Sequence, residues 1–157
     1  MAKGPFLEFL RADVKQTAAD TFTEGEIPTP SSKTESMAML IHSIELQPSK
    51  LIADEPTDLD NVMMSVTKAS KTGAAVISDP DSLAYVKIKT SIAAVFHAVV
   101  VNGSQKYTFD PPLLYPKAKL YIQISSAGIG VPVYGHVRIG YTLEKVSKED
   151  FISALVE

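Results

Sequence analysis

Apolar and polar positions alternate along much of the chain, and the longest apolar stretch is Leu83–Val101. Its first half has the period of two residues that strands show, so that Lys87 and Lys89 share one face. Its second half is almost entirely apolar and rich in β-branched residues, which is typical of a strand that is covered on both faces. Because most strands hold about 3–10 residues, we expect two strands that meet near Thr90–Ser91, or one bent strand.

Further segments with the alternation or composition of strands lie on both sides of this stretch, separated by turn residues. Two prolines within Ile27–Pro30 predict an extended edge or a rigid connector. Asn102-Gly103 predicts a hairpin that leads into the strand after it, and Asp110–Pro112 is expected to end that strand. Gly135 and Gly140 are candidate positions for a bulge or a close approach. The predicted strands are Met37–Leu46, Val62–Lys68, Ala74–Ile77, Gln105–Phe109, Lys117–Ser125 and Val131–Val146.

The N-terminal residues have the spacing of a short amphipathic helix over Pro5–Gln16. Phe6, Leu10 and Val14 follow one another at i, i+4 and i+8, which places them on one stripe of a helix. The proline at its start suits the first helical position, where no backbone N–H is needed. We therefore expect 1–17 to form a helical arm, and we expect the rest of the domain to stay folded when this arm is removed.

The C-terminal residues predict a second short helix. Ser147–Asp150 resembles a capping box, and Phe151 and Leu155 make an apolar face after it. Between the two ends lie about eight strands at short spacing with no alternation of helices and strands, which is typical of an antiparallel sandwich or barrel. The sequence therefore predicts an all-β fold: an eight-stranded antiparallel jelly-roll sandwich over 18–146, with short N- and C-terminal helices, the latter over 147–157.

Composition narrows the classes of function. The chain has 157 residues, enough for one domain with its own core, and it has no cysteine, which excludes disulfides and thiolate metal sites. The formal net charge is −3 and the only arginines are Arg11 and Arg138, so the case for direct nucleic-acid binding is weak. Lys87 and Lys89 leave only about 11 or 12 apolar residues in a row, short of the roughly 20 that a membrane span needs, so no transmembrane segment is expected.

Candidate catalytic and metal-binding side chains are few. His42, His97 and His136 all lie in predicted strands, where they could converge on one metal ion or hydrogen-bond locally; no neighbouring carboxylate or His-x-His pair favours the metal. The acidic segment Asp54–Asp60 lacks the spacing of an EF-hand, so a solvated loop is expected there, with a calcium ion at a subunit contact left open. Nucleophile, dinucleotide and Walker motifs are missing. We expect no enzyme activity and no cofactor.

Apolar residues at the two ends of the chain are the sequence feature that says most about function. They are more numerous than two short tails usually hide. They either pack on their own sandwich and close its open ends, or they dock on neighbouring subunits. The candidate assembly residues are Phe6, Leu7, Leu10, Val14, Phe151 and Leu155.

Taken in order, the segments of the chain form a recognisable series. They are a short N-terminal arm, Met37–Leu46, the central apolar stretch, Tyr107–Leu114, Lys119–Ile122, Val137–Thr142 and a terminal helix within Lys145–Leu155. Over 20–155, this series resembles the single jelly-roll capsid proteins of small icosahedral viruses. Many such coat proteins carry a genome-binding arm rich in arginine and lysine, and this N-terminus does not.

The resemblance implies a structural subunit without catalytic residues that self-assembles into an icosahedral shell. Its partners are then copies of itself, with other virion proteins left open, and its location is the virion after synthesis in the host cytoplasm. Two other classes of function remain as alternatives. Six tyrosines and the polar loops could form a β-sandwich module that binds carbohydrate or another ligand, and a cupin-like enzyme would need the histidines to gather at one metal.

Overall fold

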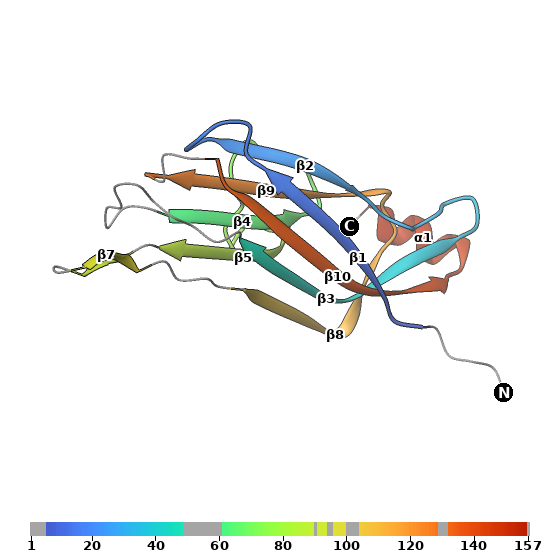
Figure 1. Ribbon diagram of the computed structural model, residues 1–157. Coiled ribbons are helices and arrows are strands. Elements are labelled where there is room, and N and C mark those ends of the chain that lie inside the picture. The colour runs from blue at the N-terminus through green and yellow to red at the C-terminus, as the bar shows by residue number, and fades with distance from the viewer. Residues whose placement is uncertain are drawn as a thin grey trace.

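The computed structural model describes residues 6–48, 61–89, 91–93, 96–99, 104–128 and 132–156. These residues form two packed four-stranded sheets, a separate two-stranded hairpin and one C-terminal helix (Figure 1). The elements are β1 (Glu8–Lys15), β2 (Phe22–Pro28), β3 (Met37–Pro48), β4 (Asn61–Thr67), β5 (Ser82–Lys89), β6 (Ser91–Ala93), β7 (Phe96–Val99), β8 (Gln105–Tyr115), β9 (Lys119–Ala127), β10 (Tyr134–Lys145) and α1 (Lys148–Leu155).

Every strand of the two large sheets runs antiparallel to its neighbours. Sheet A has the order β1-β10-β3-β8, and sheet B has the order β2-β9-β4-β5. From the ends of the chain inward, β1 pairs with β10, β2 with β9, β3 with β8 and β4 with β5. This nesting arises when one long hairpin is rolled into two facing sheets, and it defines a jelly roll. The prediction of an all-β, eight-stranded jelly-roll sandwich is confirmed.

The core lies between the two sheets and is built by alternation along each strand. In β10, Val137 and Ile139 are buried, whereas His136 and Arg138 are exposed. Successive side chains of a strand point to opposite faces, so one set meets the other sheet and the other set meets solvent. The fully buried core side chains include Ile41, Ile44, Leu46, Met64, Leu120, Ile122 and Ile124.

The helix predicted over Pro5–Gln16 is wrong. Glu8–Lys15 forms strand β1, which pairs with β10 along its whole length. A spacing of four residues fits one face of a strand as well as one face of a helix, because four is an even number. Val14 belongs to the core between the sheets. The N-terminal residues are therefore part of the sandwich, and their removal up to Gln16 would take away a strand of sheet A.

The C-terminal helix is confirmed. Ser147 is its N-cap, and the Ser147 hydroxyl accepts a hydrogen bond from the backbone N–H of Asp150 at 3.1 Å. Glu149 and Asp150 add negative charge in the first turn, which suits a helix N-terminus. Phe151 is buried, so α1 is fastened to one end of the sandwich (Figure 1).

The central apolar stretch divides close to the predicted point. β5 ends at Lys89, and β6 begins at Ser91 and pairs with β7 in the separate hairpin. The turn predicted at Asn102-Gly103 lies outside the described residues. The strand after it, β8, pairs with β3 and not with the central stretch, because the two belong to opposite sheets.

The strand that was expected to end at Asp110–Pro112 continues to Tyr115. The prolines instead interrupt its pairing with β3: Ser43 faces Thr108 on one side of the interruption, and Ile41 faces Leu113 on the other. The Asp110-Pro111 peptide bond is cis. Proline is tolerated here because β8 is an edge strand, whose outer backbone groups need no partner strand.

Two further predictions concern sheet B. Strand β2 forms one edge of the sheet and ends at Pro28, which confirms the extended edge predicted within Ile27–Pro30. Ala74–Ile77 is not a strand and belongs to 68–81, the loop between β4 and β5.

The acidic segment Asp54–Asp60 lies outside the described residues. In the part of the chain that the structure describes, no helix is long and apolar enough to cross a membrane.

Candidate functional site

Four of the six candidate assembly residues pack wholly or partly within their own subunit. Val14 is 4% exposed and lies between the sheets, and Phe151 is 2% exposed. Leu10 and Leu155 are partly buried. These four side chains are wholly or partly covered within their own subunit, and their role in assembly stays a prediction.

Phe6, Leu7 and Phe9, here named the N-terminal apolar cluster, face solvent. Phe6 and Leu7 are 71% and 53% exposed, and Phe9 is half exposed. Leu7 and Phe9 lie over Gly140, where a Cβ would be 3.7 Å from Leu7 Cδ1 and 3.4 Å from Phe9 Cε1. The guanidinium carbon of Arg138 lies 5.2 Å from the centre of the Phe9 ring, within range of a cation–π contact. These are ordinary contacts; the atom closest to a Cβ at position 140 would be Ser43 Oγ at 2.8 Å, so Gly140 is a position of close approach as predicted.

Ile152 and Val156, here named the helix ridge, form a second exposed apolar surface. They are four residues apart and lie on one side of the helix. A depression of about 360 Å³ beside the ridge is lined by Lys33 and Lys148 among others. β1 begins at the same end of the sandwich as α1, opposite to the β6–β7 hairpin (Figure 1). The two exposed apolar groups therefore share one end of the molecule.

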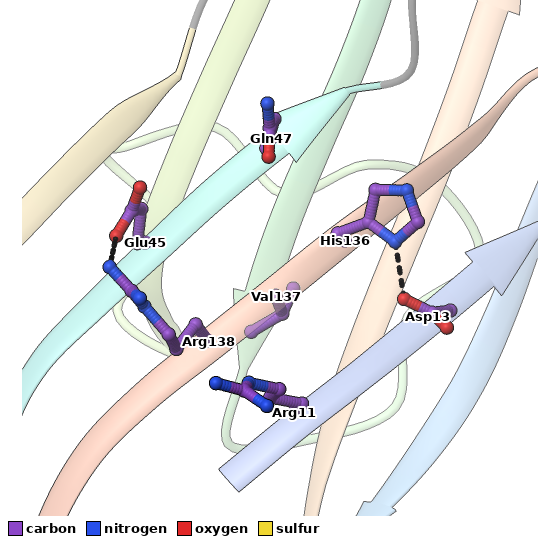
Figure 2. A pocket seen from close by; sticks show the side chains of 7 residues that line it. All are labelled: Arg11, Asp13, Glu45, Gln47, His136, Val137 and Arg138. Atoms are coloured by element: carbon purple, nitrogen blue, oxygen red, sulfur yellow. Dashed lines mark hydrogen bonds and ion pairs between the residues drawn. The ribbon is translucent and has the colours of Figure 1, made fainter. Parts of the chain in front are cut away.

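A polar depression of about 300 Å³ lies on the outer face of sheet A (Figure 2). Its side chains come from three neighbouring strands, β1, β10 and β3. Two side-chain contacts stand at its sides: His136 Nδ1 is 2.5 Å from Asp13 Oδ1 in a hydrogen bond, and Arg138 Nη2 is 2.7 Å from Glu45 Oε2 in an ion pair. The lining residues are Arg11, Asp13, Glu45, Gln47, His136, Val137 and Arg138.

Strand register explains why these residues meet. The antiparallel pairing produces two rows across the three strands, Asp13–His136–Gln47 and Arg11–Arg138–Glu45. Sequence reasoning missed the depression because it placed the β1 residues on a helix. The period of two along β1 was the available signal, since Arg11, Asp13 and Lys15 alternate with apolar neighbours.

Two of the three histidines are described, and they do not converge. His42 Nε2 is 3.0 Å from Thr142 Oγ1, and His136 pairs with Asp13 on the outer face. His136 lies opposite Gln47, whereas His42 lies five residues from Gln47 along β3, between Ser43 and Ile41, so the two histidines are separated by about 17 Å along the strands. Among the described residues, no group of three His, Cys, Asp or Glu could hold a metal ion. Local hydrogen bonding, the alternative that the sequence favoured, is found at both positions.

A second polar cluster, here named the loop clasp, fastens 68–81 to the outer face of sheet B. The Glu24 carboxylate accepts hydrogen bonds from Gln123 Nε2 at 2.9 Å, Ser70 Oγ at 2.5 Å and the Lys71 backbone N–H at 2.7 Å. Partial burial raises the pKa of Glu24, but the three hydrogen bonds outweigh it and hold that pKa below its usual value.

The inner part of the loop clasp is fully buried. Ser65 Oγ donates to Gln123 Oε1 at 2.8 Å and accepts from the backbone N–H of Ala75 at 3.1 Å. Gln123 Nε2 also donates to Thr67 Oγ1 at 2.6 Å. Because these buried polar groups satisfy one another, the clasp is a structural fastening and not an open binding site.

Comparisons with known proteins give likeness in fold only. No protein-family model and no curated protein matches the chain. A tomato aspermy virus structure is 11% identical, covers 87% of this chain and 77% of its own, and has a TM-score of 0.45. A maize chlorotic mottle virus structure is 9% identical, with coverages of 92% and 97% and a TM-score of 0.30.

A third similar structure is TmCBM61 in complex with β-1,4-galactotriose. It is 9% identical, covers 89% of this chain and 88% of its own, and has a TM-score of 0.23. The similar structures thus include viral particles and a carbohydrate complex. At these identities and TM-scores, none of the three carries an argument about what this chain does.

Proposed function

We propose that the chain is a viral coat subunit, a structural and non-enzymatic protein that self-assembles as a homo-oligomer into an icosahedral shell and resides in the virion. Its segment order, which resembles that of single jelly-roll capsid proteins, and the nested pairing of its strands support this proposal. Jelly rolls also occur in lectins and cupins. The observation that carries the proposal is therefore the exposed apolar surface at one end of the sandwich.

This surface is larger than single exposed apolar residues, which are ordinary on any protein. Phe6, Leu7 and Phe9 form one exposed group at the start of β1, and Ile152 and Val156 form a second group on α1, which lies at the same end of the sandwich. Contiguous exposed apolar groups are typical of protein contacts. A stable interface buries roughly 1,200–2,000 Å², so these residues would form the centre of a larger contact.

The two ends of the sandwich differ in structure. One end carries α1 and the N-terminal apolar cluster, and the other carries the β6–β7 hairpin (Figure 1). A contact between unlike ends is head-to-tail, and such contacts close into rings when the rotation between subunits allows it. Repetition of closed rings is how one kind of chain can tile a shell.

The test is assembly of the purified full chain, observed by electron microscopy and analytical ultracentrifugation. We expect regular hollow particles. The double variant Phe6→Ser/Leu7→Ser should lose most of these particles while its circular dichroism spectrum stays unchanged, because neither side chain belongs to the core.

Ile77→Ser is the matched control, because Ile77 is as exposed as Phe6, at 70%, but lies in the loop over sheet B. This variant should assemble like the unmodified chain. A monodisperse monomer from the unmodified chain at high concentration would overturn the coat proposal. Particles that survive in Phe6→Ser/Leu7→Ser would exclude the N-terminal apolar cluster from the contact.

A further inference from the structure

The polar depression on sheet A holds opposite charges in balance. With histidine counted as neutral, Arg11 and Arg138 carry two positive charges, and Asp13 and Glu45 carry two negative charges. A site whose charges cancel concentrates neither anions nor cations, because that selection depends on an excess of one sign. The side chains offer many hydrogen-bond donors and acceptors within the same small volume.

Stability does not account for this arrangement. The His136–Asp13 contact is exposed, with side-chain exposures of 48% and 73%, and the Arg138–Glu45 ion pair is partly exposed, at 47% and 28%; such surface pairs contribute little to folding. Arg11 lies directly opposite Arg138 in the β1–β10 register, and like charges opposite one another destabilise a sheet. The two contacts do fix the direction of the side chains, as Figure 2 shows for His136 and for Arg138.

Two lining side chains have unused hydrogen-bonding groups. Among the described residues, the side chains of Arg11 and Gln47 make no hydrogen bond or ion pair. The guanidinium offers five N–H donors, and the amide offers donors and an acceptor. Asp13 and Glu45 each use one oxygen in these contacts, which leaves their other lone pairs to accept hydrogen bonds.

We propose that this depression binds a neutral saccharide. Sugar hydroxyl groups both donate and accept, so they can accept from Arg11 and Gln47 and donate to Asp13 and Glu45. The volume is at the lower end of the range for small-ligand sites, roughly 300–1,000 Å³, which fits the terminal sugar of a glycan. The half-exposed ring of Tyr134 stands edge-on to His136 at 5.6 Å and supplies an apolar surface beside the polar groups.

The experiment uses the purified full chain on an array of neutral, sialylated and sulfated glycans, with inorganic phosphate as a separate anion probe. Titration calorimetry then measures the affinity of the best neutral glycan for three single variants. Arg11→Ala and Gln47→Ala should each weaken binding about tenfold or more, the usual effect of removing a hydrogen bond to a polar ligand. Lys106→Ala is the control, because Lys106 faces Glu45 from β8 but does not line the depression; its affinity should stay within about twofold.

Binding restricted to neutral glycans, and lost in Arg11→Ala and Gln47→Ala, supports the proposal. Three results would overturn it: no glycan binding, binding only of acidic glycans or phosphate, or neutral binding that both variants leave unchanged. Particle formation is measured on the same samples by electron microscopy. Since the coat proposal depends on residues outside the depression, each proposal can fail while the other stands.

Discussion

Met64 of sheet B fills the space above Gly135 of sheet A, so that a Cβ at position 135 would lie 2.2 Å from Met64 Sδ. Met64 is fully buried among well-packed neighbours, and moving it disturbs the core between the sheets. We expect Gly135→Ala to lower the free energy of unfolding by about 1–3 kcal/mol, the usual cost of overpacking. Urea denaturation measures this change.

Gly73→Ala is the control for that substitution. No atom lies within 4 Å of a Cβ built at Gly73, which is in the loop between β4 and β5. Its free energy of unfolding should change by less than about 0.5 kcal/mol. Equal unfolding midpoints for Gly135→Ala and Gly73→Ala would show that Met64 moves aside without cost.

The loop clasp should make the protein sensitive to acid. Hydrogen bonds from Gln123, Ser70 and Lys71 hold the pKa of Glu24 below its usual value, against the opposing effect of burial. As pH falls, the unfolded chain therefore takes up the Glu24 proton before the folded chain does, and the free energy of unfolding decreases. The contribution of Glu24 is complete above its usual pKa of 4.5 and is lost as pH falls through the lower folded value.

Glu24→Gln tests this dependence. The variant should be less stable near neutral pH by about 1–2 kcal/mol, because it loses charge-assisted hydrogen bonds, and its stability should fall less steeply on acidification. Urea denaturation at a series of pH values measures both effects. Glu26→Gln is the control, since Glu26 is exposed on the same strand and forms an exposed ion pair with Lys119. Parallel pH curves for the unmodified chain and Glu24→Gln would contradict the assignment.

Gln16 links the β1–β2 connection to β9 and to the residue before β10. It is 3% exposed; its Nε2 donates to the Thr21 carbonyl at 2.6 Å and to Ser126 Oγ at 2.9 Å, and its Oε1 accepts from the Val133 backbone N–H at 2.8 Å. Gln16→Ala would leave buried partners without hydrogen bonds, so we expect a loss of about 1–3 kcal/mol. Thermal unfolding compares it with Gln105→Ala, an exposed glutamine on β8 that should have little effect.

The sequence predicts the interior of this fold better than its edges. Strand β3 and the clean alternation in β9 follow from buried apolar residues, which face the core whichever strand lies beside them. At the edges the local pattern is ambiguous. Phe6, Leu10 and Val14 fit one face of a helix and one face of a strand equally well. The segment forms a strand because its backbone pairs with the outer edge of β10, which the local pattern does not reveal.

The two polar clusters could not be predicted, because they depend on register. Asp13 meets His136 only when β1 lies antiparallel to β10, and these residues are 123 positions apart in the chain. Glu24 and Gln123 meet through the pairing of β2 with β9. The sequence states which residues are polar, but pairing between distant strands decides which of them share a face.

Phe151 and Ile152 separate the two roles proposed for the C-terminal helix. Phe151 is almost fully buried, so Phe151→Ala should destabilise the fold by about 3–5 kcal/mol, as removal of a buried aromatic ring does. Ile152 is exposed on the helix ridge, so Ile152→Ser should leave the urea midpoint unchanged and reduce the yield of assembled particles in ultracentrifugation. If Ile152→Ser assembles normally while Phe151→Ala unfolds, α1 serves only to close its own sandwich, and the subunit contact must rest on the N-terminal apolar cluster.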